Sequence, residues 1–238
     1  VTWSVCAFVL TIIATEFWKG TQARAHIEGE GYAVALFHLV TRNRRRWGGY
    51  IVHVGIVMIY FAFAGAAYNV DERQHMLPGD QVDITSPFGH TYTLTYEGLS
   101  VSLGRGQRNL LWQAIATVSV EQDGVAKGIL TTEKRQYVTS DQLMTEVGIR
   151  STVREDLYLI LSAMDDVDGA LSANSGAQGI DLQVLVKPFV AWIWYGGLIL
   201  ALGTVIALWP SVDRRRRSTR PELEAVTTSA PAMAGAAR

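Results

Sequence analysis

The hydrophobic positions of this chain follow two different periods. In residues 1–18, 47–69 and 188–209 the apolar residues run together, whereas in residues 81–187 they largely alternate with polar ones. Long apolar runs are typical of helices that cross a membrane, and alternation is typical of strands with one buried face. The pattern therefore predicts a membrane α-helical protein with an inserted antiparallel β domain.

Three stretches are candidates for crossing a bilayer. Residues 47–69 and 188–209 each hold more than 20 residues without a charge, which is enough for ~30 Å of hydrocarbon. Residues 1–18 are shorter and carry Glu16; a signal peptide is the alternative there, but no basic segment precedes the apolar one. Because the chain begins inside this stretch, we expect a helix with a truncated start and three C-terminal spans of a larger helical bundle.

The distribution of charge predicts an orientation. Residues 19–46 and 210–238 contain the clusters "RRR" and "RRRR", whereas residues 70–187 hold 16 acids and 9 bases, a net charge of −7. Since basic loops stay in the cytoplasm, both flanking segments are expected there. Residues 70–187 then form an extracytoplasmic β domain, on the opposite side of the membrane.

The segments around these spans have their own patterns. In the connector 19–46, apolar residues at helical spacing predict an amphipathic helix on the cytoplasmic face: Ala33, Leu36, Phe37 and Val40. In the β domain, Asp123-Gly124 between two alternating runs predicts a hairpin. The small and acidic residues at 165–179 predict a flexible loop, and the tail 210–238 is expected to be a disordered basic segment.

Few residues offer catalytic chemistry. The sequence shows no Ser/His/Asp set, no glycine-rich phosphate loop and no metal-ligand spacing, so we predict no catalytic residue. Cys6 is the single cysteine, and we expect a small buried hydrophobe. The arginine run "RRRR" is better explained by topology or contact with membrane lipid than by nucleic acid.

His53 is the exception because it lies inside an apolar run. At 1.5 Å per residue it is ~9 Å inside the predicted helix, where a polar group needs a partner. Gly49 lies one turn earlier, and Val57 and Tyr60 continue the same face. Two interpretations remain open: a hydrogen bond to a neighbouring helix or backbone carbonyl, or an axial ligand to haem iron.

The other four histidines lie outside the predicted spans. His26 and His38 belong to the connector and are expected to be solvated or interfacial. His75 and His90 fall on the far side of the membrane, beyond reach of His53. A second axial ligand would therefore come from residues upstream of Val1 or from another chain.

Four ordered motifs carry a resemblance to a known family. "NRRRWGGYIVHVGIVMI", "GDQVDI", "MTEVGIRSTVREDLYLIL" and "VKPFVAWIWYGGLILALGTVIAL" resemble the C-terminal third of CcmF, the haem lyase subunit of bacterial cytochrome c-type biogenesis. The paralogue NrfE, which serves nitrite reductase assembly, is similar. The resemblance extends from about Cys6 to Trp209.

The resemblance implies a multi-pass inner-membrane protein. Its family takes haem from a periplasmic haem chaperone and joins it to the thiols of a Cys-x-x-Cys-His motif in apocytochrome c, beside thiol-handling maturation subunits. A transmembrane haem b is held there by two histidines, and His53 stands at the position of one of them. That haem is thought to aid reduction of the substrate haem. The family's tryptophan-rich periplasmic segment and its flanking histidines lie upstream, so their roles are not transferred to His75 or His90.

These implications give our functional expectation. The chain would be the C-terminal part of a haem lyase subunit, inactive by itself; the alternative is a membrane-anchored docking module for the maturation complex, without catalysis of its own. A transporter half is disfavoured because the clear spans lack charges and breaks. Residues in the third motif either pair structurally or meet a partner: Glu146, Arg154, Glu155, Asp156 and Tyr158.

Overall fold

A computed structural model describes residues 1–104, 109–166, 169 and 178–210. Residues 1–208 form one compact unit, and a second unit begins at Trp209. The predicted disordered tail and most of the predicted loop at 165–179 lie outside the described residues.

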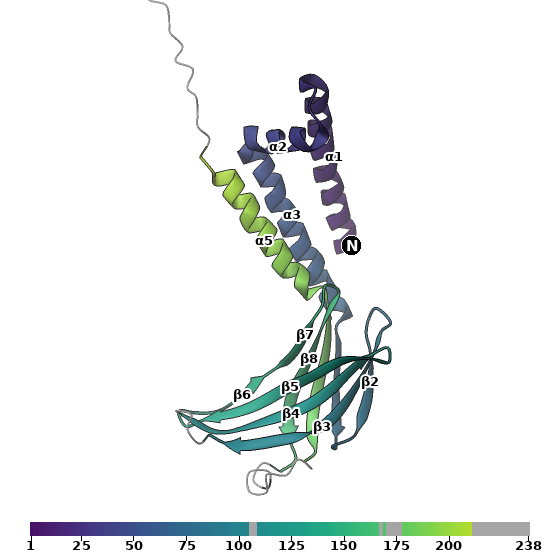
Figure 1. The fold of residues 1–238 in the computed structure, drawn as a ribbon, viewed down its shortest axis with the longest axis vertical. Helices are drawn as coiled ribbons and strands as arrows, with labels where there is room; N and C mark the ends of the chain where they lie inside the picture. The colour runs from purple at the N-terminus through teal and green to yellow at the C-terminus, as the bar shows by residue number, and fades with distance from the viewer. Residues whose placement is uncertain (105–108, 167–168, 170–177, 211–238) are drawn as a thin grey trace, which may run out of the picture. The chain divides into compact units, whose positions relative to one another are not determined.

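In the first unit the described helices lie together at one end of a β domain (Figure 1), although some precede that domain in the chain and one follows it. The helices are α1 (Thr2–Glu28), α2 (Tyr32–Arg42), α3 (Arg44–Gly65) with the short 3-10 helix η1 (Ala66–Tyr68), and α5 (Val190–Leu208). Within the described residues, two helices are long and apolar enough to cross a membrane, at Arg44–Tyr68 and Val190–Leu208. The second and third predicted spans thus have matching helices, whereas the helix of the first predicted span is not among those apolar enough to cross a membrane.

The first predicted span differs from its expectation in length. α1 continues past the predicted end at Trp18 and stops at Glu28, where Gly29 takes the left-handed conformation with φ 67°. A glycine just after the last turn is a common helix ending. The predicted amphipathic helix is found as α2, and its Leu36 and Phe37 are exposed. Cys6 is buried, as predicted.

Helices α3 and α5 are antiparallel neighbours joined through glycines. A Cβ atom built on Gly55 would lie 2.6 Å from the Gly196 carbonyl oxygen, and one on Gly203 would lie 2.6 Å from the Val52 amide nitrogen. At Gly48 the nearest atom would be the Ala207 amide nitrogen, at 2.7 Å. Small residues let two helix backbones approach closely where a membrane offers no hydrophobic drive between helices.

The predicted antiparallel β domain is a sandwich of two sheets. One sheet has the order β1-β9-β8-β7 and the other β2-β3-β4-β5-β6, and all pairings are antiparallel. The strands are β1 (Val70–Met76), β2 (Gln81–Thr85), β3 (Thr91–Leu103), β4 (Leu110–Gln122), β5 (Val125–Tyr137), β6 (Ser140–Glu146), β7 (Gly148–Ser151), β8 (Glu155–Met164) and β9 (Ile180–Pro188).

The core lies between the two sheets and follows the alternation seen in the sequence. Leu94 and Tyr96 of β3 belong to the same buried cluster as Leu157 and Leu159 of β8, and all four are at most 1 % exposed. Burying such apolar side chains contributes roughly 25 cal/mol for each Å² removed from water. The sandwich therefore has a continuous core of its own.

The predicted hairpin turn at Asp123-Gly124 is confirmed, whereas strand β1 was not predicted. Asp123 and Gly124 both have positive φ, 54° and 73°, between the paired Gln122 and Val125, as a two-residue hairpin requires. Strand β1 was not predicted, because its sequence VDERQHM is polar and only Met76 is buried. It forms one edge of the four-stranded sheet, where a strand needs little apolar surface.

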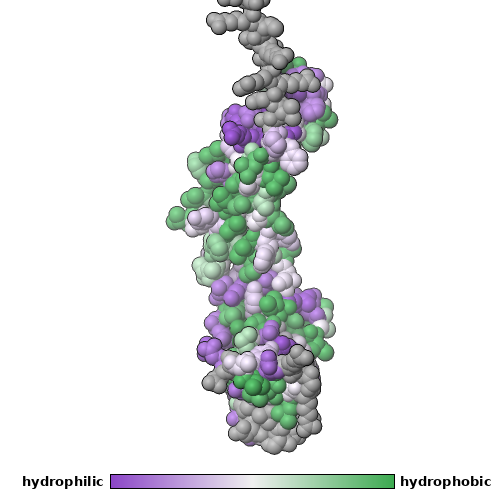
Figure 2. Space-filling model, turned by 90° about the vertical axis from the view of Figure 1, so that its left-hand side faces the viewer, coloured by the Kyte–Doolittle hydropathy of each residue, from purple (hydrophilic) through white to green (hydrophobic). Residues whose placement is uncertain are grey.

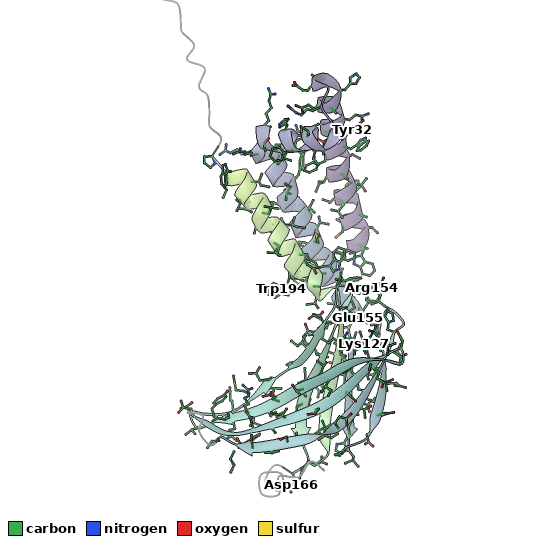
Figure 3. All side chains as sticks on the ribbon, in the orientation of Figure 1. Tyr32, Lys127, Arg154, Glu155, Asp166 and Trp194 are labelled. Atoms are coloured by element: carbon green, nitrogen blue, oxygen red, sulfur yellow. The ribbon has the colours of Figure 1, made fainter. Side chains whose placement is uncertain are left out.

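An aromatic cluster joins the sandwich to the helices. Phe189, between β9 and α5, has φ 62° and donates its N–H to the Arg154 carbonyl at 2.8 Å. Its ring lies 4.8 Å from Phe61 of α3 and 5.3 Å from Phe88 of the β2–β3 loop, centroid to centroid. Figure 3 shows Arg154 and Glu155 at this end of the sandwich and Asp166 at the far end.

Candidate functional site

His53 lies on an exposed position of α3 and makes one hydrogen bond. Its Nδ1 is 2.7 Å from the Gly49 carbonyl oxygen, one turn earlier. Because a carbonyl only accepts, the hydrogen sits on Nδ1, which leaves the Nε2 lone pair unused by any partner among the described residues. A histidine that ligates a metal holds its ring in this way, with the other nitrogen donating to a carbonyl.

The rest of this face is also open. Residues at helical spacing after His53 are exposed, namely Ile56 at 36 %, Tyr60 at 59 % and Phe63 at 60 %. A Cβ atom built on Gly49 would meet nothing within 4 Å. The open face of α3 (Gly49, His53, Ile56, Tyr60 and Phe63) is therefore an apolar and aromatic surface around one imidazole.

The other two faces of α3 are covered. α5 packs on the glycine face, and α1 packs on a face where the Cys6 Sγ is 3.8 Å from the Val57 carbonyl oxygen and Phe17 is 4.7 Å from Trp47. One expectation for the surroundings of His53 needs correction here, since Val57 is buried and does not continue the open face. Gly48 and Gly55 face α5, so these glycines admit a neighbouring helix.

Neither α1 nor α5 brings a second histidine beside His53. α5 contains no histidine, and the one histidine of α1 is His26, near its end. Phe17 of α1 lies level with Trp47 and Tyr50, so His26, nine residues further on, lies ~13 Å beyond the level of Trp47. His53 lies in the opposite direction, and the two side chains cannot share one iron.

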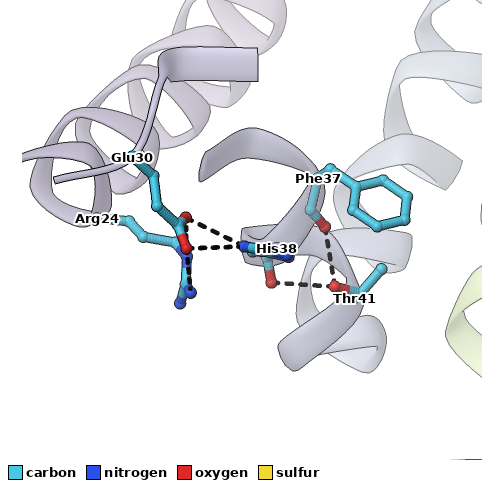
Figure 4. A network of polar contacts seen from close by, with 5 residues as sticks. All are labelled: Arg24, Glu30, Phe37, His38 and Thr41. Atoms are coloured by element: carbon cyan, nitrogen blue, oxygen red, sulfur yellow. Dashed lines mark hydrogen bonds and ion pairs between the residues drawn. The ribbon is translucent and has the colours of Figure 1, made fainter. Parts of the chain in front are cut away.

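The connector histidines are placed at the helix junction. His26 is exposed, and Nδ1 of His38 lies 3.0 Å from the Glu30 carboxylate, which also accepts from Arg24 at 3.3 Å (Figure 4). Their surface or interfacial placement agrees with the expectation. The hydrogen bond from His38 is the main cause that lowers the pKa of Glu30.

The sandwich histidines pair with carboxylates instead of facing His53. His75 Nδ1 is 2.9 Å from Asp181 and Nε2 is 3.6 Å from Asp165, and the Asp181 hydrogen bond is the main cause that raises the pKa of His75. His90 Nδ1 is 2.7 Å from Asp123. The Thr91 N–H, followed by the His90 hydrogen bond, lowers the pKa of Asp123.

The third sequence motif contributes a buried carboxylate. Glu155 is 2 % exposed, and its two oxygens accept from the Ser86 hydroxyl at 2.5 Å and the Tyr92 hydroxyl at 2.8 Å. Asp156, 3 % exposed, accepts from the Thr152 N–H at 3.2 Å. Glu155 and Asp156 therefore pair within the sandwich, which is the structural one of the two roles expected for this motif.

Other members of that motif are also paired. Glu146 lies 3.7 Å from Arg135, and the Lys187 ammonium lies 4.9 Å from the Tyr158 ring centre. The burial of Glu155 was missed, although it stands two residues before Leu157, at an inward position of the same alternating run. The period of the strand could have revealed it.

The fold and the two apolar helices together indicate a class of protein. An antiparallel β-sandwich inserted between two helices that are long and apolar enough to span a bilayer fits a membrane protein with a domain outside the bilayer. Figure 2 shows the apolar surface along the helices, with hydrophilic surface at the level of α2 and again where the sandwich begins.

Comparison with known proteins makes the class specific. The family model described as the CcmF C-terminal beta-sandwich matches residues 67–188. The chain therefore belongs to the CcmF family of cytochrome c-type biogenesis proteins.

Individual relatives agree with this assignment. The cytochrome c-type biogenesis protein CcmF of Escherichia coli K12 is 33 % identical over 180 residues, which cover 74 % of this chain and 25 % of that protein. Its counterpart in Pseudomonas fluorescens is 29 % identical over 218 residues, 91 % of this chain and 28 % of that protein. The chain thus spans about a quarter of the length of these relatives.

A solved structure shares the fold. The structure named cytochrome c heme lyase CcmF aligns with a TM-score of 0.56 and 17 % identity, over 84 % of this chain and 34 % of that chain. Because the identity is low, this match shows only that the two proteins share the architecture of the helices and the sandwich.

Proposed function

We propose that this chain is the C-terminal part of a haem lyase subunit, and that His53 is one axial ligand to a transmembrane haem b. In this proposal the intact protein takes haem from a periplasmic haem chaperone and supports its covalent attachment to apocytochrome c. Each thioether forms when a cysteine S–H adds across a haem vinyl C=C bond, so the attachment itself needs no oxidant or reductant. This portion alone is not expected to perform it.

The haem proposal rests on the hydrogen bonding and the exposure of the His53 side chain. Its Nδ1 hydrogen is engaged with the Gly49 carbonyl, and its Nε2 lone pair is available on an open apolar face. A haem bound there would supply an iron that changes oxidation state by one electron. The protein's own contribution is to hold the imidazole in one tautomer and to exclude water with Ile56, Tyr60 and Phe63.

The orientation belongs to the same proposal. The arginine-rich start of α3 and the acidic sandwich lie at opposite ends of this helix. Placing the arginines in the cytoplasm puts the sandwich in the periplasm, where haem attachment would occur, and the C-terminus in the cytoplasm.

A pair of variants of the full-length protein tests the ligand. We expect His53→Ala to remove the α-band of a low-spin haem b from the reduced spectrum and to lower haem per protein by about one equivalent of the native haem b. His38→Ala, in the connector, is the matched control and is expected to keep both. Equal haem content and an unchanged α-band in His53→Ala would contradict the assignment.

A second candidate is a docking module without its own catalysis, and one surface favours it. The exposed apolar residues at the far ends of β3 to β6 form what we term the tip cluster: Leu103, Leu111, Val138, Leu143 and Met144. β6 is also an edge of its sheet, and edge strands can pair with an extended peptide. The candidate partners are apocytochrome c, the haem chaperone and the thiol-handling subunits.

Binding of purified apocytochrome c to the His53→Ala protein separates the two candidates. If docking is the function, this haem-deficient protein binds as tightly as the wild type, and Met144→Glu weakens binding several-fold. If binding is lost with the haem and Met144→Glu has no effect, the tip cluster is not the docking surface.

A further inference from the structure

A pocket outside the haem-binding face lies where α1, α2 and α3 meet. It has a volume of ≈ 640 Å³. Its lining contains four bases and one acid, together with four uncharged residues: Lys19, Arg24, Arg42, Arg46, Glu16, Gly20, Leu39, Asn43 and Trp47. We call it the basic pocket.

Two of the four bases are already neutralised and two are not. Arg46 lies 2.8 Å from Glu16, and Arg24 lies 3.3 Å from Glu30. Lys19 and Arg42 have no hydrogen bond or ion pair within the part of the chain that the structure describes. The basic pocket therefore holds an excess of positive charge that an anion would balance.

The helices are packed closely at this point, so the arrangement is fixed. A Cβ atom on Gly20 would lie 2.9 Å from both the Leu39 Cδ2 and the Trp47 ring. Trp47 is only 4 % exposed, and the Arg46 guanidinium lies 5.3 Å from its ring centre. Because Gly20 has no side chain, α1 approaches α2 and α3 closely, and Lys19 and Arg42 line the same pocket.

The basic pocket stands beside an apolar groove. The groove lies between α1 and α2 and is lined by Ala14, Phe17, Trp18, Thr21, Tyr32, Ala33 and Leu36. Figure 3 marks Tyr32 at this junction, and Tyr32 stacks on Trp18 at 6.0 Å. The rings of Phe17, in the groove, and Trp47, in the basic pocket, are 4.7 Å apart. A charged pocket next to an apolar groove at the start of a membrane helix suits a molecule with an anionic head and an apolar chain.

We propose that the basic pocket binds a phosphate group at the membrane boundary, with Lys19 and Arg42 as its direct cationic partners. The phosphate is either the headgroup of an anionic phospholipid, whose chain would lie in the apolar groove, or free inorganic phosphate. Lysine acts on phosphate as a point charge and arginine adds directed N–H donors. This site does not depend on the haem proposal, since it shares no residue with the open face of α3.

Native mass spectrometry of the full-length protein in detergent tests the proposal. Phosphatidylglycerol is titrated against phosphatidylcholine, which carries the same phosphate with no net charge, and inorganic phosphate is added as a competitor. Arg42→Gln is compared with Arg45→Gln, which removes an exposed base three residues further on that does not line the pocket. Thermal unfolding is recorded for each variant to show that the protein is folded.

We expect Arg42→Gln to weaken phosphatidylglycerol binding about fivefold, the effect of one base near an anionic headgroup, while Arg45→Gln binds as the wild type does. Inorganic phosphate that binds with the same dependence on Arg42, without lipid selectivity, would assign the free anion. Equal weakening by both variants, or none by either, would overturn the site, because the attraction would then belong to the basic surface as a whole.

Discussion

Single residues in the sandwich show how a polar group is kept in a core. Glu155 is buried with a hydroxyl on each carboxylate oxygen, from Ser86 and Tyr92. Burial, followed by this hydrogen bond, raises the pKa of Tyr92, and burial raises the pKa of Tyr96 to about 12. The two tyrosines thus stay neutral donors at physiological pH, and the β2–β3 loop is tied to β8.

Removing the carboxylate is expected to cost stability. Glu155→Ala leaves the buried hydroxyl of Tyr92 and that of Ser86 without an acceptor, which lowers the free energy of unfolding by about 2–4 kcal/mol. Thermal or denaturant unfolding of the purified protein measures it. Glu121→Ala removes an exposed carboxylate of β4 and serves as the control; a similar loss in both variants would argue against the special role of Glu155.

His75 predicts a pH dependence of stability. Its pKa is raised by Asp181 and Asp165, so the protonated form is favoured in the folded state. That contribution is fully present below the unfolded pKa of about 6.5 and is lost as the pH rises through the higher folded pKa. We expect His75→Gln to lower the melting temperature slightly at pH 5.5 and not at pH 9. An equal decrease at both values would indicate a role independent of charge.

At the scale of elements, the α3–α5 pair depends on which side of a helix each glycine occupies. A Cβ atom on Gly196 would lie 2.8 Å from the Gly55 carbonyl oxygen, whereas one on Gly197 would meet nothing within 4 Å. The sequence shows these glycines as equivalent neighbours. Only the packing of the two helices distinguishes them.

This difference gives a matched pair of substitutions. Gly196→Ala forces the two backbones apart and is expected to destabilise the protein by about 1–3 kcal/mol. Gly197→Ala points into open space and is expected to be neutral or slightly stabilising, because alanine favours a helix. Unfolding in detergent compares them, and equal behaviour of the two variants would refute the helix contact.

At the scale of the whole first unit, residues 1–208, the helices and the sandwich are coupled through Phe189. Its ring contacts Phe61 of α3 and Phe88 of the β2–β3 loop. A bulky residue at positive φ is unfavourable by itself, so this conformation depends on the surrounding aromatic contacts. The cluster is therefore the place where a change in the helices would reach the sandwich.

Truncation of that ring is expected to loosen the junction. In Phe189→Ala, amide hydrogen exchange should become faster in the β2–β3 loop and at the start of α5, with the centre of the sandwich unchanged. Leu103→Ala, an exposed apolar residue of the tip cluster, is the control and leaves the junction as it was. Faster exchange throughout the sandwich would mean that Phe189 supports the core instead of the junction.

The sequence by itself determined the features that depend on local period and composition. The run 47–69, the run 188–209, the alternation of the β domain and the turn at Asp123-Gly124 all predicted the elements that are found, because each signal lies within a few residues. Ordered motifs were enough to indicate the family.

Tertiary structure decided everything that depends on residues far apart in the chain. It assigned Gly48 and Gly55 to the α5 contact, left the face of His53 open, paired Glu155 with Ser86 of the β2–β3 loop and made a strand of the polar segment at Val70–Met76. Each outcome is set by which distant element packs against a residue. A periodic pattern can tell that a helix or strand has several faces, but not which neighbour covers each of them.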